Sequence, residues 1–231
     1  MDMTVTTDIE RHPWEPFIPP RTKVLMLGSF PPKKERWSMD FFYPNFNNDM
    51  WRIIGAIFFG DKEYFIDRGG TDRDGSIRGK AASGRLKPRF DRDRITAFCN
   101  SAGLALYDTA LEVRRLADNA SDKFLEVVTP VDIRAMLDRM PECTAIISTG
   151  EKASSIIAAE FGCPIPKVGS YMELPGFRPA HRPGHDEEAT AGNTPAVRFY
   201  RLPSSSRAYP LALDRKIQAY SILKGLLLPA E

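Results

Sequence analysis

Two turns that are rich in small and polar residues follow short apolar runs, and together they could hold a flat ligand that carries a phosphate. The first turn consists of Gly28, Ser29, Phe30 and Pro31, and the second of Pro203, Ser204, Ser205 and Ser206. A glycine lets a flat ligand approach the backbone closely, and a serine turn offers hydroxyl and N–H groups that can hold a phosphate. Because proline and serine are also ordinary turn formers, either turn alone is more simply explained as a loop.

Two further apolar runs also end at polar residues. Asp108 follows the run 103–107, and Ser148-Thr149-Gly150 follows the run 144–147. In an open parallel α/β sheet, ligands bind beyond the carboxyl ends of the strands. The four run ends therefore define a candidate site.

Several common sites are missing from the sequence. There is no GxGxxG and no GxSxG motif, and the segment 79–84 lacks the GK[ST] core of a phosphate loop. Asp91 and Asp93 are better explained as a solvated helix start than as metal ligands. Three cysteines and three histidines form no zinc signature. We therefore expect neither a metal nor a cofactor.

The elements that would position these residues alternate between strand and helix. Apolar runs predict strands at 23–28, 103–107, 144–147 and 197–202, and helical spacing predicts helices at 47–59, 90–102, 129–139, 152–161 and 211–227. Asn47 or Asn48 is a candidate N-cap of the first helix, and Thr129-Pro130 a candidate N-cap and N1 pair of the third. This alternation predicts a parallel α/β sheet with right-handed crossovers.

Length and composition suit a soluble protein of one domain, 1–231. The chain is 42% hydrophobic and 27% charged, which is too apolar for disorder. Residues 1–22 look like a Pro-rich lead-in, 61–90 like an irregular basic insertion loop, and 176–196 like a polar loop. The N-terminus has no apolar signal-peptide core, no run is long enough to cross a membrane, and unpaired cysteines fit a reducing compartment. We expect a cytoplasmic monomer with no obligate protein partner.

Four segments in order resemble one known family. They are Leu25–Pro32 (LMLGSFPP), Phe42–Trp51 (FYPNFNNDMW), Gly103–Asp108 (GLALYD) and Leu202–Ser206 (LPSSS). Together they resemble the uracil-DNA glycosylase superfamily, and most closely its hypoxanthine-DNA (deoxyinosine) glycosylase branch. The resemblance runs from about residue 12 to about residue 226. It implies a three-layer α/β/α fold with a short four-stranded parallel sheet, and excision of a deaminated base from DNA without a cofactor.

The resemblance also implies roles for individual residues. The loop Gly28–Pro31 would lie along a flipped base, with Tyr43 stacking on the base and Asp108 reading its edge. Phe30 stands where better-known branches have an Asp or Asn that handles the attacking water. The hypoxanthine branch instead draws a catalytic Asn from a segment ending in Asn-x-[Phe/Met]-Trp, which matches Asn48.

The serine loop would contact the DNA backbone. By the same resemblance, Ser204, Ser205 and Ser206 would grip phosphates. Relatives that insert a leucine into DNA have it in this loop, whereas this chain has Ser206-Arg207. Arg207 or Tyr209 would then replace the wedge.

Physical chemistry supports these roles but leaves alternatives open. An aromatic ring such as Tyr43 stacks well on a base, and its alternative role is packing in the core. An ionised Asp108 only accepts hydrogen bonds, which suits the ring N–H of uracil or hypoxanthine, but it could also cap a helix. A neutral amide such as Asn48 can orient water and help the leaving base, and it could also serve as an N-cap.

The first hypothesis is a DNA-repair glycosylase that removes hypoxanthine or uracil. The alternative is a noncatalytic nucleic-acid-binding relative, which Phe30, the missing leucine wedge and the 61–90 loop would favour. A small-molecule α/β hydrolase is disfavoured because the nucleophile elbow and a general-base histidine are absent.

Charge is distributed unevenly along the chain. The formal net charge of +2 excludes a wholly basic nucleic-acid binder, yet segments 21–36, 68–94 and 198–231 carry net charges of +4, +5 and +4. We predict that these segments converge on one face and make DNA binding salt-sensitive.

Overall fold

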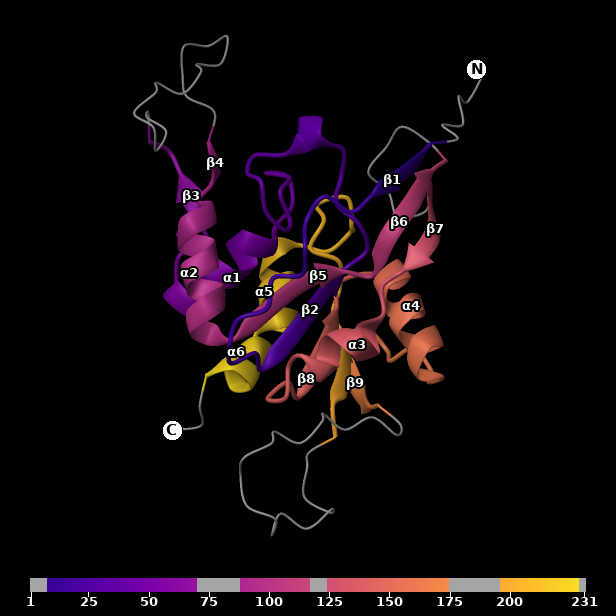
Figure 1. Cartoon of the computed structure of the whole chain (residues 1–231). Helices are drawn as coiled ribbons and strands as arrows, with labels where there is room; N and C mark the ends of the chain where they lie inside the picture. The colour runs from indigo at the N-terminus through magenta and orange to yellow at the C-terminus, as the bar shows by residue number, and fades with distance from the viewer. Residues whose placement is uncertain (1–7, 70–87, 117–123, 175–195, 229–231) are drawn as a thin grey trace.

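A five-stranded sheet forms the centre of the molecule (Figure 1). The structure, a computed structural model, describes residues 8–69, 88–116, 124–174 and 196–228. The sheet has the order β5(Leu104–Asp108)-β2(Val24–Gly28)-β8(Ala145–Ser148)-β10(Arg198–Arg201)-β9(Ser170–Glu173). The first four strands are parallel, which confirms the predicted four-stranded parallel sheet. The polar strand β9 adds an antiparallel edge that the sequence analysis missed.

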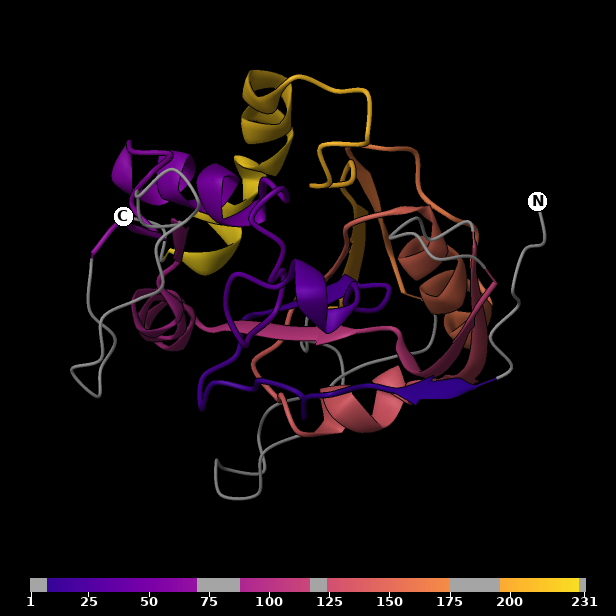
Figure 2. The same ribbon diagram turned by 90° about the horizontal axis from the view of Figure 1, so that it is seen from above.

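Helices cover both faces of this sheet, so the predicted three-layer arrangement is confirmed (Figures 1 and 2). One layer consists of α1(Met50–Phe59), α2(Arg92–Ala102), α5(Leu213–Tyr220) and α6(Ile222–Leu227), and the other of α3(Ile133–Asp138) and α4(Glu151–Phe161). Right-handed crossovers require this division, because the connection from β2 to β5 and the connection from β5 to β8 run in opposite directions across the sheet.

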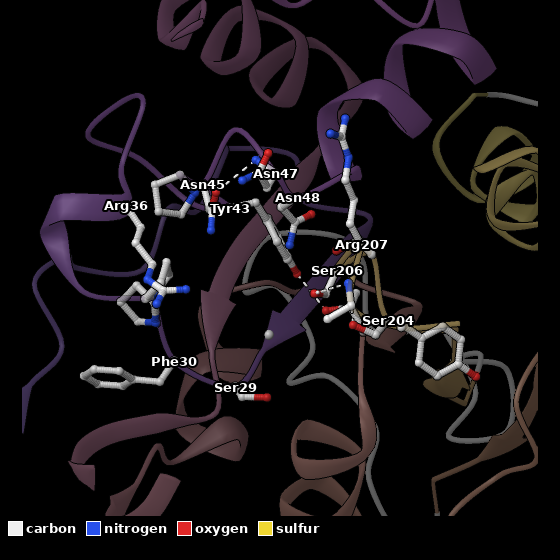
Figure 3. A pocket seen from close by; sticks show the side chains of 18 of the residues that line it. Ser29, Phe30, Arg36, Tyr43, Asn45, Asn47, Asn48, Ser204, Ser206 and Arg207 are labelled. Carbon is white, nitrogen blue, oxygen red and sulfur yellow. Dashed lines mark hydrogen bonds between the residues drawn. The ribbon is translucent and has the colours of Figure 1, made fainter. Parts of the chain in front are cut away.

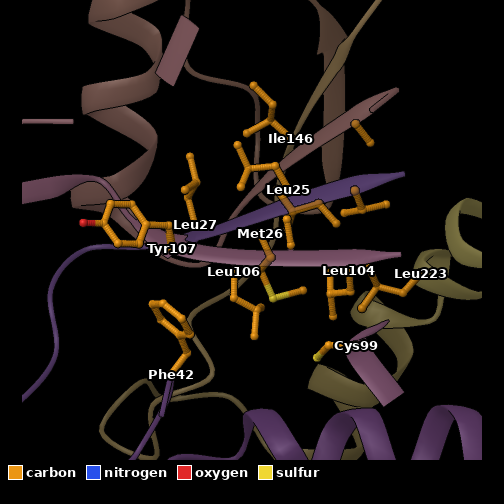
Figure 4. Packing of buried hydrophobic residues seen from close by; sticks show 14 of the residues in the cluster. Leu25, Met26, Leu27, Phe42, Cys99, Leu104, Leu106, Tyr107, Ile146 and Leu223 are labelled. Atoms are coloured by element: carbon orange, nitrogen blue, oxygen red, sulfur yellow. The ribbon is translucent and has the colours of Figure 1, made fainter. Parts of the chain in front are cut away.

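The core consists of side chains that alternate across the central strands (Figure 4). Every residue of β2 and of β5 is buried, as expected for strands that are covered on both faces. Leu25 and Leu27 point to one side of the sheet, whereas Met26 points to the other side with Leu104 and Leu106. Gly103 ends α2 in the left-handed conformation (φ 75°), where an added Cβ would lie 2.3 Å from the carbonyl oxygen of Arg21.

Two small antiparallel sheets flank the central one. The strands β1(Ile9–Arg11), β6(Ala110–Arg115) and β7(Leu125–Pro130) form the first, and β3(Ile66–Asp67) pairs with β4(Arg89–Phe90) in the second. The Pro-rich lead-in therefore contains a strand. The pair β3–β4 brackets most of the expected irregular loop, whose residues 70–87 lie outside the described part of the chain.

Two predicted element boundaries were wrong. Thr129-Pro130 does not start a helix, because it ends β7, and α3 begins after Asp132, whose side chain accepts a hydrogen bond from the Ala135 N–H (2.8 Å). The predicted terminal helix 211–227 is divided at Ser221 into α5 and α6.

Some expectations concern single residues. Cys99 and Cys143 are buried, Cys163 is half-buried, and all three are free thiols, as predicted. Burial raises the pKa of Cys143 to about 12. Among the described residues, no helix combines the length and the apolar character that a membrane crossing requires. Most of the predicted loop 176–196, including His181 and His185, lies outside the described residues.

Candidate functional site

A pocket of about 640 Å³ opens at the carboxyl ends of the parallel strands (Figure 3). It is lined by every residue to which the sequence analysis gave a role toward the base or the DNA: Gly28, Ser29, Phe30, Pro31, Tyr43, Asn48, Asp108, Ser204, Ser205, Ser206 and Arg207. These residues come from the ends of β2, β5 and β10 and from the loop before α1. Of the expected run end Ser148-Thr149-Gly150, only Thr149 lines the pocket. A volume of this size is typical of small-ligand sites.

The pocket contains a carboxylate that lies directly against a glycine. Gly28 and Asp108 are the last residues of β2 and β5, and they are paired in the register of the two parallel strands. A Cβ on Gly28 would lie 2.2 Å from Asp108 Oδ1 and 3.5 Å from the Tyr43 hydroxyl. Only glycine at position 28 therefore leaves room for this carboxylate oxygen beside the pocket.

The other oxygen of Asp108 faces a buried histidine. His12 Nε2 lies 3.1 Å from Asp108 Oδ2, and the His12 side chain is 0% exposed. The ring packs against Tyr107, with 4.6 Å between ring centroids, and against the edge of Phe30 at 5.5 Å. Asp108 itself is buried, so this contact is largely removed from water.

Tyr43 is held in a backbone conformation that non-glycine residues rarely adopt (φ 51°). Its hydroxyl hydrogen-bonds to Thr149 Oγ1 at 3.0 Å, and its ring meets the buried Trp51 edge-on at 6.3 Å. Trp51 is in turn fixed by a hydrogen bond from its Nε1 to the Phe42 carbonyl. The aromatic surface of Tyr43 is therefore held rigidly beside the pocket.

Asn48 has an amide whose orientation is determined by its neighbour. Its Oδ1 accepts a hydrogen bond from the Met50 N–H at 2.9 Å. The amide nitrogen must therefore be on the other side, and in Figure 3 it points into the pocket. The N-cap position of α1 belongs to Asp49, so neither Asn47 nor Asn48 is the N-cap that the sequence suggested.

The serine loop is tied to the start of α1. Asn48 forms an isolated antiparallel bridge with Ser206, and the Asp49 N–H donates to the Ser205 carbonyl at 2.9 Å. Below the loop, the Tyr220 hydroxyl donates to the Pro203 carbonyl at 2.7 Å. Burial raises the pKa of Tyr220 well above its usual range, so this phenol remains a donor. The loop that carries the serines is therefore anchored both to the start of α1 and to α5.

A buried charge cluster also supports this loop. Asp49 accepts from Lys216 Nζ at 3.1 Å and from Arg207 Nε at 2.8 Å. Lys216 donates in addition to the Ser206 carbonyl at 2.8 Å, and its side chain is only 1% exposed. In Figure 3 the Arg207 side chain runs away from the centre of the pocket. Arg207 thus braces the loop in this conformation.

Positive charge lies at the pocket on the side opposite the serines. Arg36 belongs to the short 3-10 turn Lys34–Arg36, lines the pocket, and in Figure 3 reaches down toward Phe30. Arg115 also lines the pocket, where it pairs with Glu10 at 2.8 Å and donates to the Pro31 carbonyl at 2.7 Å. The site can therefore attract an anion from one side and donate hydrogen bonds from the other.

Comparison with known proteins bears on the fold. No family model and no curated protein matches the sequence. Among solved structures, the chain is similar to the solution structure of a protein from Methanosarcina acetivorans that is described as a putative uracil DNA glycosylase. The similarity covers 95% of this chain and 99% of that chain, with a TM-score of 0.53 and 17% sequence identity. The chain therefore shares that protein's fold.

Several residues that support or line the pocket were not found from the sequence. His12, Asp49 and Lys216 act through contacts between positions that are far apart in the chain, which no local pattern reveals. Arg36 was counted only as part of a basic segment, although it lines the pocket. Within the described residues, no cluster of His, Cys, Asp or Glu is arranged to hold a metal ion.

Proposed function

We propose that this protein is a DNA glycosylase that excises a deaminated base, hypoxanthine or uracil, after the base has been flipped out of DNA. The observation that carries the proposal is the set of three groups around one pocket. Asp108 Oδ1 is an acceptor for a base edge, the Tyr43 ring is a stacking surface, and the Asn48 amide is a donor. A flipped base is recognised by hydrogen bonds to its edge and by stacking, and a preorganised donor serves the cleavage step.

Base recognition would combine stacking with one directional hydrogen bond. Stacking on a ring such as Tyr43 contributes about 1–3 kcal/mol per base. Asp108 Oδ1 would accept the ring N–H that deamination creates in uracil or hypoxanthine. Together these contacts can offset the few kcal/mol that unstacking a base costs.

Asn48 would stabilise charge in the transition state. Because its Oδ1 is occupied by the Met50 N–H, Asn48 acts toward the pocket through its N–H groups. Such a donor can hold the oxygen of the attacking water or stabilise the negative charge that develops on the departing base. Cleavage through an oxocarbenium-like state needs such preorganised donors more than a strong base.

The rim of the pocket is suited to the DNA backbone. The hydroxyl groups and N–H groups of Ser204–Ser206 and the guanidinium of Arg36 lie on opposite sides of the opening. We propose that they bind the phosphates on either side of the flipped nucleotide, since serine hydroxyls, backbone N–H groups and arginine are common phosphate ligands.

A substrate panel tests the proposal. The protein is incubated with oligonucleotides, single- and double-stranded, that carry one uracil, hypoxanthine, xanthine or mismatched normal base, and abasic sites are then cleaved with alkali. We expect strand breaks at uracil or hypoxanthine and not at the matched normal bases. DNA binding without breaks on any substrate would overturn the catalytic proposal and favour a noncatalytic nucleic-acid-binding protein.

A further inference from the structure

His12 occupies an aromatic enclosure behind the base-reading carboxylate. It directly follows β1, and its backbone N–H donates to the Leu111 carbonyl at 2.8 Å. Trp14 and Phe42 surround the ring together with Phe30 and Tyr107. Within the described part of the chain, the imidazole has polar contacts only with Asp108 and with the Trp14 backbone. A completely buried imidazole with two specific polar partners has a defined orientation.

The partners of the ring are satisfied in more than one protonation state. Nδ1 lies 2.8 Å from the Trp14 carbonyl oxygen and 3.2 Å from the Trp14 nitrogen. A neutral ring with its proton on Nε2 accepts from the Trp14 N–H, whereas an imidazolium donates to the Trp14 carbonyl. Either form donates from Nε2 to Asp108 Oδ2. If the proton lies on Oδ2 instead, that oxygen donates to Nε2 and the Trp14 carbonyl accepts from Nδ1.

All these arrangements have the same consequence for the pocket. The shared proton lies between Nε2 and Oδ2, so Oδ1 beside Gly28 carries none and can only accept. The other titratable group that packs against the His12 ring is Tyr107. Burial, together with the negative charges of Glu15 and Asp108, raises the pKa of Tyr107 to about 12. Tyr107 is therefore a neutral phenol. The guanidinium of Arg115, on the other side of the Phe30 ring, is already paired with Glu10.

We propose that His12 is a specificity-determining residue. It occupies Oδ2 of Asp108, so that only Oδ1 faces the pocket, as an acceptor, and cytosine and adenine are excluded. A free carboxylic acid can bind the edge of cytosine or adenine with two hydrogen bonds, donating to the ring nitrogen and accepting from the exocyclic amine. With Oδ2 occupied by His12, this paired contact is unavailable. A cytosine or adenine would then present an unpaired ring nitrogen to Oδ1, which is unfavourable in a buried site.

The chemical class that satisfies Oδ1 is a base with a ring N–H beside a carbonyl. Uracil, hypoxanthine and xanthine belong to this class. Thymine and guanine share the N–H, but a correctly paired base costs more to unstack than a mismatched or damaged one. This inference rests on the proposed function, since it concerns the base that the same pocket accepts.

The test compares His12→Phe with His12→Gln. Phenylalanine fills the aromatic enclosure without a donor, whereas the glutamine amide can still donate to Oδ2. The protein and its variants are titrated with oligonucleotides that carry one deoxyuridine or deoxycytidine bearing a 2′-fluorine, which blocks cleavage by disfavouring the oxocarbenium-like state. Thermal unfolding of each variant establishes that it is folded.

We expect the preference for uracil over cytosine to fall about tenfold in His12→Phe, the effect of one lost buried hydrogen bond. His12→Gln should restore the preference, because its amide again donates to Oδ2. A folded His12→Phe with an unchanged preference would overturn the proposal. So would a parallel loss of affinity for both bases, because a purely structural role predicts that result.

The two proposals fail in different ways. If the unmodified protein excises no base and shows no base preference, the proposed function fails. If it excises uracil or hypoxanthine and His12→Phe leaves the preference intact, only the role of His12 fails. Should His12→Phe not fold, Asp108→Asn is the second variant. His12 then donates to the amide carbonyl, the amide N–H₂ faces the pocket, and the preference should shift toward cytosine; an unchanged preference would overturn the proposal.

Discussion

Lys216 and Asp49 form a buried ion pair, with 3.1 Å between Nζ and Oδ2, at the junction of the serine loop and helix α1. The same lysine donates to the Ser206 carbonyl, and the same aspartate accepts from Arg207. The pair therefore connects the loop that would bind DNA to the segment that carries Asn48. Stability and site geometry depend on the same contacts here.

Replacing Lys216 with methionine should destabilise the protein by up to about 3–5 kcal/mol, because the buried Asp49 carboxylate would keep only the half-exposed Arg207 as a cationic partner. Urea unfolding measures the change. Lys224→Met is the matched control, because Lys224 is exposed on α6 and such surface changes usually stay within about 0.5 kcal/mol. The double variant with Asp49→Asn should lose less stability than the sum of the single variants. Strict additivity would contradict the coupling.

Gly28→Ala should abolish most excision while leaving the fold intact. The added Cβ would lie 2.2 Å from Asp108 Oδ1 and would push that oxygen out of its position. Misplacement by about 1 Å can cost about 100-fold in rate, so single-turnover excision should fall by about that factor. Gly225→Ala is the control, because no atom lies within 4 Å of a Cβ at that position. A wild-type rate in Gly28→Ala would remove Asp108 from base recognition.

The Asn48 amide can be dissected with two substitutions. Asn48→Ala removes both the pocket donor and the hydrogen bond to the Met50 N–H, whereas Asn48→Asp keeps an acceptor for Met50, loses the donor and adds a negative charge. Each variant should lower single-turnover excision by about 100- to 1,000-fold, the usual effect of removing one transition-state donor. Asn48→Asp should be the more stable of the two on thermal unfolding. Wild-type rates in either variant would exclude Asn48 from catalysis.

Most of the central sheet could be predicted because β2, β5 and β8 are local, fully buried runs of mainly apolar residues, and β10 carries two buried aromatic residues. Strands β1, β7 and β9 were missed because they are largely half-exposed and mixed in polarity, so the period-two pattern of their sequences is weak. Thr129-Pro130 gave a wrong prediction for a related reason, since the same two residue types that favour the start of a helix stand here at the end of strand β7. In both cases tertiary pairing decided the outcome.

The site was predictable where it lies at strand ends, and its supporting residues were not. The turn at Gly28 and the serine loop follow from the rule for parallel sheets. His12 and Asp108 are 96 positions apart, and Lys216 and Asp49 are 167 apart. Each pair is formed only by tertiary folding, and neither residue of a pair has a local pattern that indicates its partner.

Arg36 should contribute to DNA affinity through a phosphate contact, because its guanidinium lies at the pocket opposite the serine loop. Arg36→Gln should weaken binding to all sequences alike and reduce the slope of log Kd against log salt concentration by about 1. Fluorescence anisotropy at several salt concentrations measures both effects. Arg139→Gln is the charge-matched control. This exposed residue is the C-cap of α3 and lies before the amino end of β8, whereas the pocket lies at the carboxyl ends of the strands. An equal change of slope in both variants would mean that net charge, rather than a contact at the pocket, governs the salt dependence.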